Sequence, residues 1–165
     1  MRVCDVVVLG HGIAGGFLAR QLKLTRPDLD VVVLEASDAM TDFKVGESTV
    51  EVAAHYMIKR LRLGAYLYQH QLPKNGLRFF FDSKEKDLPL TAMSEIGSDH
   101  FPFHPSFQLE RAALERDLVA MNRASGVEVV LGAKVTDVAI DGDPVGAGQV
   151  VIYEYGGEWC VLWVR

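Results

Sequence analysis

The stretch that decides the fold is "VVVLGHGIAGG", residues Val6–Gly16. It joins a run of β-branched apolar residues to three glycines spaced as G-x-G-x-x-G. From Val3 to Leu9 the chain is almost continuously apolar, and such a run predicts a strand buried on both faces, as in a parallel sheet. Glycines at this place either open a helix that binds a dinucleotide or form a plain turn, so the flanking sequence has to decide.

The flanking sequence favours a nucleotide-binding βαβ unit. "FLARQLKLTRPD" has the apolar spacing of a helix, which we expect to end before Pro27. "DVVVLEAS", Asp30–Ser37, then predicts a second buried strand. A strand, a glycine turn, a helix and a strand follow one another within the ordinary length of a βαβ unit. The fold class is therefore α/β, a Rossmann-like domain with a parallel sheet.

Each glycine has a physical role in this interpretation. Gly10 permits the tight turn, Gly12 lets a pyrophosphate approach the backbone, and Gly15 lets helix and strand pack closely. The helix N-terminus offers free N–H groups to the phosphates. Glu35 ends the second strand, where a carboxylate can accept hydrogen bonds from a ribose but repels a 2′-phosphate. The expected ligand is therefore FAD or NAD rather than NADP.

Composition excludes several classes of partner. The 165 residues are 49% hydrophobic and 24% charged, which suits one globular domain. The net charge of −5 and the lack of a basic block argue against nucleic acid, and no apolar run near the N-terminus is long enough for a signal peptide or a membrane span. Cys4 and Cys160 are far apart, so we expect no disulfide, no metal site and a cytoplasmic location. His100 and His104 lie in a predicted loop, where their spacing fixes no metal geometry.

Two further helices are predicted downstream. Ser48 and Glu51 have capping-box spacing, so we expect Ser48 to cap a helix from about residue 49 to 63. "SFQLERAALERDLVAMNRASG" predicts a second helix, capped by Ser106 and stopped by Gly126. Between them, "LRFFF" (Leu77–Phe81) predicts a strand whose aromatic residues we assign to the core.

The remaining elements favour FAD over NAD. After the second helix come two strands in "VEVVLGAKVTDVAIDGD" and a hairpin that turns near Gly156 and Gly157, which together make a β-meander. A NAD domain usually continues with further βα units, whereas this interruption is typical of flavoproteins. We expect residues 1–165 to form one incomplete FAD-binding domain, with a long inserted loop at about 65–105.

Five segments carry a resemblance to a known family. They are "VVVLGHGIAGGFLARQL", "VVVLEAS", "KVGESTVE", "LPKNGLRFFF" and "FQLERAALERDLVAMNRASGVEV", in that order. Together they resemble the N-terminal third of the flavin-dependent halogenases and, more broadly, the FAD-dependent oxidoreductases related to p-hydroxybenzoate hydroxylase and geranylgeranyl reductase. The resemblance runs from about Val3 to Ile140, and "VGEST" is its most specific part.

The resemblance implies roles for particular residues. It places the "GES" segment beside the flavin, with Glu47 fixing the loop or touching the flavin. It implies that Lys74 in "PKNG", or Arg78 if the alignment shifts, presents or activates hypohalous acid, because a desolvated ammonium can make its proton available. The expected cofactor-binding residues are Gly10, Gly12, Ile13, Ala14, Gly15, Glu35, Ala36, Gly46, Glu47, Ser48, Gln108 and Arg111.

Gln108 and Arg111 are expected on one face of the second predicted helix, three residues apart. In the wider family this helix start lies near the ribityl chain and pyrophosphate. The resemblance implies that Gln108 bonds flavin hydroxyls. Arg111 is expected to pair with phosphate, or with a carboxylate such as Glu47 or Glu115.

The family is longer than this chain. Its returning strand, its second "GD" segment and the W-x-W-x-I-P signature of halogenases are not found here, so we expect an incomplete chain whose open sheet edge favours self-association. The implied function is that of the FAD-binding part of a halogenase or monooxygenase, which uses reduced FAD and O₂ on a small organic substrate with a separate flavin reductase. The alternatives are a saturase of the geranylgeranyl-reductase kind and an inactive nucleotide-binding fragment.

Overall fold

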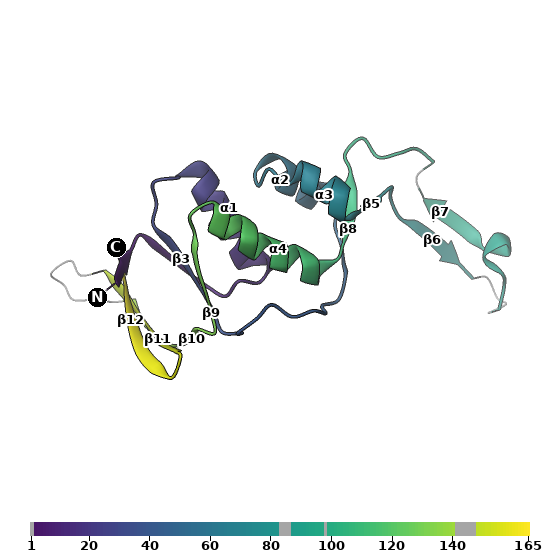
Figure 1. Ribbon diagram of the computed structural model, residues 1–165. Coiled ribbons are helices and arrows are strands. Elements are labelled where there is room, and N and C mark those ends of the chain that lie inside the picture. Colours follow the sequence, from purple (N-terminus) through teal and green to yellow (C-terminus); the bar gives the residue numbers. More distant parts are fainter. Residues whose placement is uncertain (1, 83–86, 98, 141–147) are drawn as a thin grey trace. The chain divides into compact units, whose positions relative to one another are not determined.

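The computed structural model describes residues 2–82, 87–97, 99–140 and 148–165 (Figure 1). The chain divides into two compact units. The first unit comprises Met1–Gly46 and Glu110–Arg165, and the second comprises Glu47–Leu109.

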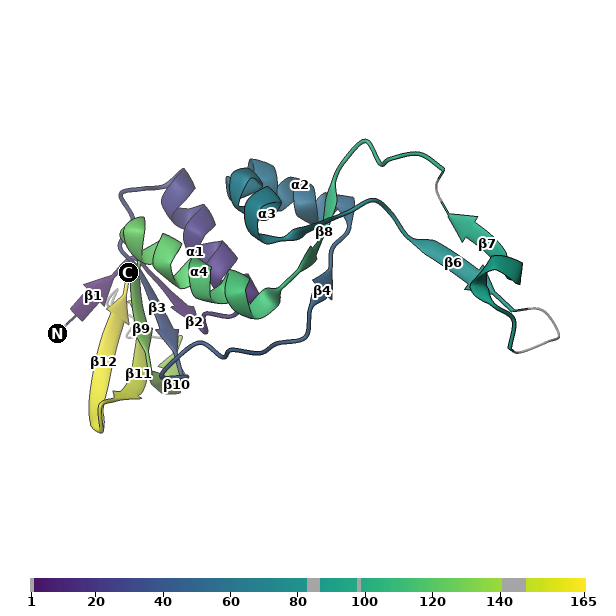
Figure 2. The same cartoon turned by 45° about the vertical axis from the view of Figure 1, so that its right-hand side comes forward.

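A three-stranded parallel sheet lies at the centre of the first unit. Its strands are β2 (Val6–Leu9), β3 (Val31–Glu35) and β9 (Glu128–Leu131), in the order β2-β3-β9. Helices α1 (Ile13–Thr25) and α4 (Arg111–Ala124) lie side by side in both ribbon views (Figures 1 and 2). The α/β class with a parallel sheet is thereby confirmed.

Strand β3 shows why a strand in the middle of this sheet has an unbroken run of apolar residues. Val31 and Val33 pack into one core cluster, while Val32 and Leu34 pack into another. All four side chains are buried because successive residues of a strand point to opposite faces, and both faces of this sheet are covered. The first cluster includes Ala19 of α1 and Val119 of α4, so the helices cover that face.

A second sheet in this unit contains three of the four strands of the predicted β-meander and one added strand. The other predicted strand, β9, lies in the parallel sheet instead. Its order is β1 (Arg2–Cys4), β12 (Glu158–Val164), β11 (Gln149–Tyr155) and β10 (Lys134–Ala139). The β11–β12 hairpin turns at Gly156 and Gly157, whose φ angles of 60° and 82° suit glycine. The predictions of two strands in the segment starting at Val127 and of this hairpin are confirmed.

The single strand expected from Val3 to Leu9 is wrong, because the chain changes sheet at Asp5. Residues up to Cys4 pair in parallel with β12, and residues from Val6 pair in parallel with β3. At the change, an Asp5 carboxylate oxygen accepts a hydrogen bond of 2.8 Å from the Asp30 amide. Asp5 is the one charged residue of the run, but a single polar residue does not tell one interrupted strand from two strands in different sheets.

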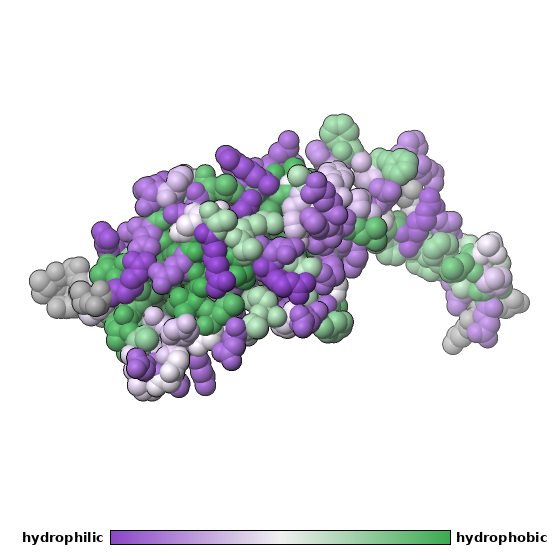
Figure 3. Space-filling model, in the orientation of Figure 1, coloured by the Kyte–Doolittle hydropathy of each residue, from purple (hydrophilic) through white to green (hydrophobic). Residues whose placement is uncertain are grey.

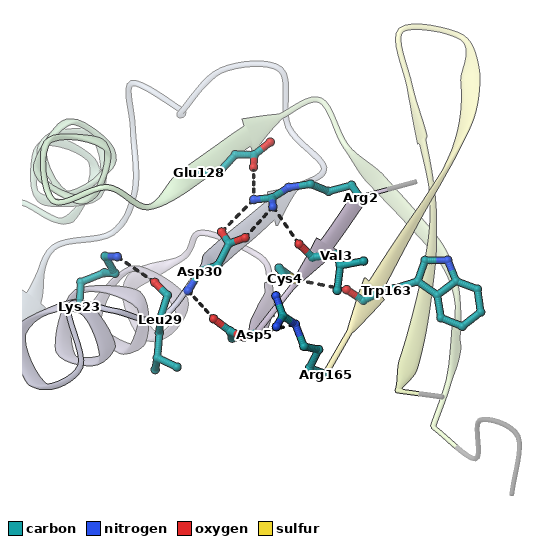
Figure 4. A network of polar contacts seen from close by, with 10 residues as sticks. All are labelled: Arg2, Val3, Cys4, Asp5, Lys23, Leu29, Asp30, Glu128, Trp163 and Arg165. Carbon is teal, nitrogen blue, oxygen red and sulfur yellow. Dashed lines mark hydrogen bonds and ion pairs between the residues drawn. The ribbon is translucent and has the colours of Figure 1, made fainter. Parts of the chain in front are cut away.

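An ion-pair network holds β1 against the starts of two other strands (Figure 4). The Arg2 guanidinium donates to both carboxylate oxygens of Asp30, at 2.5 and 2.8 Å, and to Glu128 at 2.9 Å. Nearby, Arg165 Nε lies 3.7 Å from an Asp5 carboxylate oxygen. These side chains are partly exposed, so the network fixes geometry more than it stabilises the fold.

The second unit has its own small sheet and two helices. The sheet contains β4 (Glu47–Ser48), β8 (Ser106–Leu109) and β5 (Leu72–Lys74), with β8 in the middle. The range expected as a long inserted loop, 65–105, contains regular elements over much of its described length. The elements of this unit outside the sheet are α2 (Glu51–Lys59), α3 (Gly64–His70), a two-stranded hairpin of β6 (Arg78–Phe81) and β7 (Ser94–Gly97), and a 3₁₀ turn at Leu90–Ala92.

Both predicted serine caps are wrong, because β8 takes the serines into the sheet. Ser48 lies in β4 opposite Gln108, and α2 begins at Glu51 with Val50 as its N-cap. Ser106 lies in β8 opposite Lys74. Glu110 caps α4 instead, since its carboxylate accepts from the Ala113 amide at 3.1 and 3.2 Å.

The predicted strand at "LRFFF" is confirmed as β6, but its assignment to the core is wrong. Phe79, Phe80 and Phe81 are 54%, 41% and 50% exposed. Figure 3 shows apolar residues at the surface in the region of β6 and β7.

No helix among the described residues is long and apolar enough to cross a membrane.

Candidate functional site

The glycine loop between β2 and α1 has the geometry that its spacing predicted. Gly10 has a φ of 91°, a region that favours glycine, and its amide donates to the Leu34 carbonyl at 2.7 Å. A Cβ atom on Gly15 would lie 2.0 Å from the Gly10 carbonyl oxygen, so only glycine fits there. A Cβ on Gly12 would meet no atom within 4 Å, which leaves open space beside the backbone at the start of α1.

Glu35 is the last residue of β3, and its side chain bonds to the glycine loop that follows β2. Its Oε2 accepts a hydrogen bond of 2.7 Å from the His11 amide, and its Oε1 accepts one of 2.9 Å from the Ser37 amide. Burial raises the pKa of this carboxyl, but the two amide donors more than offset that effect, so the pKa lies below its ordinary value. The carboxylate is therefore ionised, and it lines a pocket of about 200 Å³ with Gly10, Ala36 and Lys134 among the other lining residues.

A buried carboxylate lies at the first turn of α1. Glu115 on α4 has a side chain only 1% exposed, and its Oε1 accepts from the Ile13 amide at 3.2 Å and from Arg111 Nε at 2.7 Å. Its Oε2 accepts from the Lys44 ammonium. Burial raises the pKa of Glu115, but the hydrogen bonds from Lys44 and Arg111 outweigh burial, so the pKa is lowered.

This cluster brings two cations to the glycine loop around one negative charge. Arg111 pairs with Glu115, one of the two carboxylates expected for it, and the pair has i, i+4 spacing on α4. Lys44 was missed in the sequence, because its partner is 71 residues away and no local pattern links them. Two cations and one carboxylate leave one positive charge in excess at a helix N-terminus, an arrangement that suits an anion.

His11, inside the glycine motif, is fully buried. Its Nε2 lies 3.1 Å from Asn122 Nδ2, which also donates to the Gly16 carbonyl at 3.0 Å. Burial lowers the pKa of His11, so the imidazole is neutral near neutral pH. The side chain thus ties the loop to α4.

In the second unit, the small sheet brings Lys74 to the "GEST" segment. The Lys74 ammonium donates to Ser48 Oγ at 2.7 Å and to the Thr49 carbonyl at 2.6 Å. Thr49 was not among the expected site residues. Its hydroxyl donates to the Phe107 carbonyl at 2.9 Å and accepts from the Phe107 amide at 2.8 Å, within the buried part of the unit.

The prediction that Gln108 and Arg111 share one face of a helix is wrong. Gln108 lies in β8, opposite Ser48 on one side and Leu72 on the other, whereas Arg111 is the first residue of α4. The spacing of three residues carries no meaning across this change from strand to helix. Glu47 lies opposite Leu109 in the same sheet, and Ala14, Ala36 and Gly46 of the first unit are exposed.

Arg78, the alternative to Lys74, forms an ion pair with Glu95 across the β6–β7 hairpin. It also lines a pocket of about 350 Å³ with Asn75, Gly76, Asp99 and His100 among the other lining residues. His104 contacts the rings of His55 and Phe103, at centroid distances of 5.9 and 4.9 Å. Among the described residues, no three His, Cys, Asp or Glu side chains are grouped as metal ligands.

Known proteins with similar sequences are halogenases. The chain is 36% identical over 136 residues to the flavin-dependent halogenase chlA of Dictyostelium discoideum, an alignment that covers 74% of this chain and 22% of that protein. It is 30% identical over 132 residues to the flavin-dependent halogenase malA of Malbranchea aurantiaca, covering 79% of this chain and 20% of that one. No protein-family model matches the chain.

Solved structures of halogenases have the same fold. The myxobacterial chondrochloren halogenase CndH, described as a variant of the FAD-dependent halogenases, matches with a TM-score of 0.78 at 24% identity, over 100% of this chain and 36% of that one. The halogenase PltM, solved in complex with phloroglucinol and FAD, matches with a TM-score of 0.70 at 18% identity, over 97% and 33%. The chain thus spans about a fifth of the length of the curated relatives and about a third of these structures. Over the length that it shares with them, the chain belongs to the flavin-dependent halogenase family.

Proposed function

We propose that the chain is the FAD-binding N-terminal part of a flavin-dependent oxidoreductase of the halogenase or monooxygenase type. The observation that carries the proposal is the glycine loop, in which Gly12 leaves open space at the start of α1 while Glu35 ends β3 beside it. The proposed domain covers residues 1–165. The substrate of the whole protein is proposed to be a small organic molecule, with reduced flavin delivered by a separate reductase.

The residues present fit the ADP half of FAD. The diphosphate would lie against the Gly12–Gly15 backbone, where no side chain fills the space that a Cβ on Gly12 would take. The ribose would bond to Glu35, and the pocket that includes Gly10 and Ala36 lies at that carboxylate. Lys44 and Arg111 supply the positive charge that two phosphates need.

The carboxylate of Glu115 has a second task in this site. It bonds the Ile13 amide and both cations, so it holds the first turn of α1 and the two positive side chains in one geometry. Pre-organised charges lose less entropy on binding than mobile ones. Glu115 is therefore proposed to position Lys44 and Arg111 for the diphosphate, although it carries the wrong charge to bind a phosphate itself.

Bound reduced FAD would supply the reaction with O₂, and the protein would supply binding, orientation and exclusion of water. In the halogenase reading, Lys74 donates a hydrogen bond to the oxidised halogen and holds it for the substrate. Ser48 and Gln108 lie on neighbouring strands of the same small sheet as Lys74, and they are proposed to contact the flavin.

A binding titration of the chain tests the proposal. FAD and ADP are titrated into the purified protein, and binding is followed by calorimetry and by quenching of flavin fluorescence. Gly12→Ala is expected to fold normally, because its Cβ meets no protein atom, but to weaken binding of both ligands about tenfold or more, since that Cβ occupies the diphosphate space.

Gly64→Ala is the matched control, because a Cβ there makes only an ordinary contact of 3.5 Å with Ile58, far from the glycine loop in sequence. It is expected to bind both ligands as the wild type does. A folded wild-type chain that takes up neither FAD nor ADP would refute the proposal. Equal affinity of the Gly12→Ala variant and the wild type would remove the glycine loop from it.

A further inference from the structure

The sheet of the second unit holds one ammonium group in a defined direction. Lys74 Nζ has two acceptors, Ser48 Oγ at 2.7 Å and the Thr49 carbonyl at 2.6 Å. Both bonds have the length of strong charge-assisted hydrogen bonds. An ammonium group has three hydrogens in a fixed tetrahedral arrangement, so two such bonds also fix the direction of the third.

The two acceptors are themselves held in place. Thr49 bonds to Phe107 of β8 three times: its amide and its hydroxyl donate to the Phe107 carbonyl, and its hydroxyl accepts from the Phe107 amide. Phe107 is fully buried, so the Thr49 carbonyl is anchored in the core of the unit. Ser48 is held by its pairing with Gln108 on the same strand β8.

Lys74 is anchored from the same strand. It lies opposite Ser106, whose hydroxyl donates to the Lys74 carbonyl at 3.2 Å. The backbone of Lys74 and both acceptors of its ammonium are therefore fixed to three consecutive residues of β8, Ser106, Phe107 and Gln108. Holding a group within a narrow range of directions is what a reacting molecule requires of it.

We propose that Ser48 and the Thr49 carbonyl are positioning groups for Lys74, which take two of its ammonium hydrogens and aim the third at an acceptor atom of the reacting molecule. This role rests on the proposed function, in which that acceptor is an oxidised halogen species. The inference assigns a task to the serine of "GEST" that differs from helix capping and from contact with the flavin. It also assigns a task to Thr49, which acts through its backbone rather than its hydroxyl.

The test observes the ammonium directly and needs no flavin. In the chain labelled with ¹⁵N-lysine, the NH₃⁺ groups are recorded by two-dimensional NMR at mildly acidic pH, and Lys74→Met assigns the Lys74 signal. A held ammonium gives a sharp signal with slow hydrogen exchange, whereas a solvated lysine such as Lys59 exchanges fast. Ser48→Ala is expected to speed the exchange of the Lys74 signal about fivefold, the factor that one ordinary hydrogen bond provides.

Two further variants separate positioning from a general effect on the fold. Ser48→Thr keeps a hydroxyl at the same place and is expected to restore slow exchange. Ser106→Ala removes a bond to the backbone of Lys74 but none to its ammonium, so it is expected to leave the exchange rate within about twofold of the wild type while the fold persists. Thermal unfolding of each variant is measured alongside.

The following results would overturn either the inference about Ser48 and Thr49 or the proposed function. A wild-type Lys74 signal that exchanges as fast as that of Lys59, or a Ser48→Ala variant that leaves it unchanged, would overturn the inference even if the chain binds FAD. An equal acceleration in Ser106→Ala would show that Ser48 acts only through the sheet and would overturn it as well. Failure to bind FAD with a held Lys74 would refute the proposed function instead.

Discussion

The main-chain amide of Ile13 donates to the Oε1 atom of Glu115 at 3.2 Å, so a carboxylate from α4 lies on the first turn of α1. The same carboxylate bonds Lys44 and Arg111. One buried carboxylate thus binds three groups from separate parts of the chain: the N-terminus of α1, the Lys44 ammonium and the Arg111 guanidinium.

Replacing this acid is expected to cost stability. Glu115→Gln keeps the shape but removes the charge, so Lys44 and Arg111 lose their partner and at least one hydrogen bond to a charged group is lost, at about 2–3 kcal/mol of unfolding free energy. Urea unfolding followed by circular dichroism measures it. Glu128→Gln is the control, because Glu128 is half exposed in its ion pair with Arg2, and we expect a cost below about 1 kcal/mol. Equal costs for the two variants would contradict the assignment.

Lowering the pH is expected to reduce the unfolding free energy over two separate pH ranges, an upper and a lower stage. The pKa of His11 is lowered by burial, so the unfolded chain binds a proton more readily, and stability falls as the pH falls below the ordinary histidine value of about 6.5. The lowered pKa values of Glu115 and Glu35 act in the same direction below about 4.5, because their bonded carboxylates must be protonated. Urea midpoints measured from pH 8 to pH 3 show both stages.

His11→Phe tests the upper stage of this acid response. Phenylalanine fills a similar space without a titrating group. The decrease in the urea midpoint between pH 7 and pH 5 should therefore shrink, while the decrease at lower pH remains. A curve with the same slope as the wild type in that range would show that His11 is not the group responsible.

Gly15→Ala is expected to disrupt the loop that Gly12→Ala leaves intact. The new Cβ would lie 2.0 Å from the Gly10 carbonyl oxygen, a backbone atom that cannot move without shifting the turn. Overpacking of this kind costs about 1–3 kcal/mol. A thermal unfolding midpoint at the wild-type value would show that the loop has more room than the structure gives it.

Thr49→Val is expected to loosen the second unit. Valine has nearly the same shape, but it can neither donate to the Phe107 carbonyl nor accept from the Phe107 amide, and an unpaired buried amide costs about 1–3 kcal/mol. Hydrogen exchange of the Phe107 amide, together with urea unfolding, measures the effect. Thr136→Val removes one exposed bond to the Ile152 carbonyl and should change stability by less than about 0.5 kcal/mol.

Local sequence predicted the parts of the fold that depend on local geometry. The glycine loop, strand β3 and the β11–β12 hairpin need only neighbouring residues or a simple apolar pattern, and they were predicted correctly. The serine caps failed because S-x-x-E spacing is a local signal, whereas the backbone at Ser48 is bound by β8, about 60 residues later.

The candidate site shows the same division. The position of Glu35 could be predicted from the end of a buried strand, because the end of that strand beside a glycine turn is fixed by the βαβ unit itself. Its role toward a ribose stays a prediction. Lys44 could not be assigned, because its role depends on how α4 packs against α1. Thr49 could not be predicted for a related reason. Its backbone carbonyl is the group that accepts from Lys74, and no residue pattern shows where a carbonyl points.

The pairing of β1 with β12 has a consequence for synthesis on the ribosome. Arg2 lies opposite Leu162, so β1 can reach its place only after β12, about 160 residues later in the chain, has been translated. At the usual rate of translation the delay is on the order of ten seconds, during which β1 lacks the strand with which it pairs in the fold. Cys4, which is fully buried in the fold, is expected to stay accessible to thiol reagents throughout that interval.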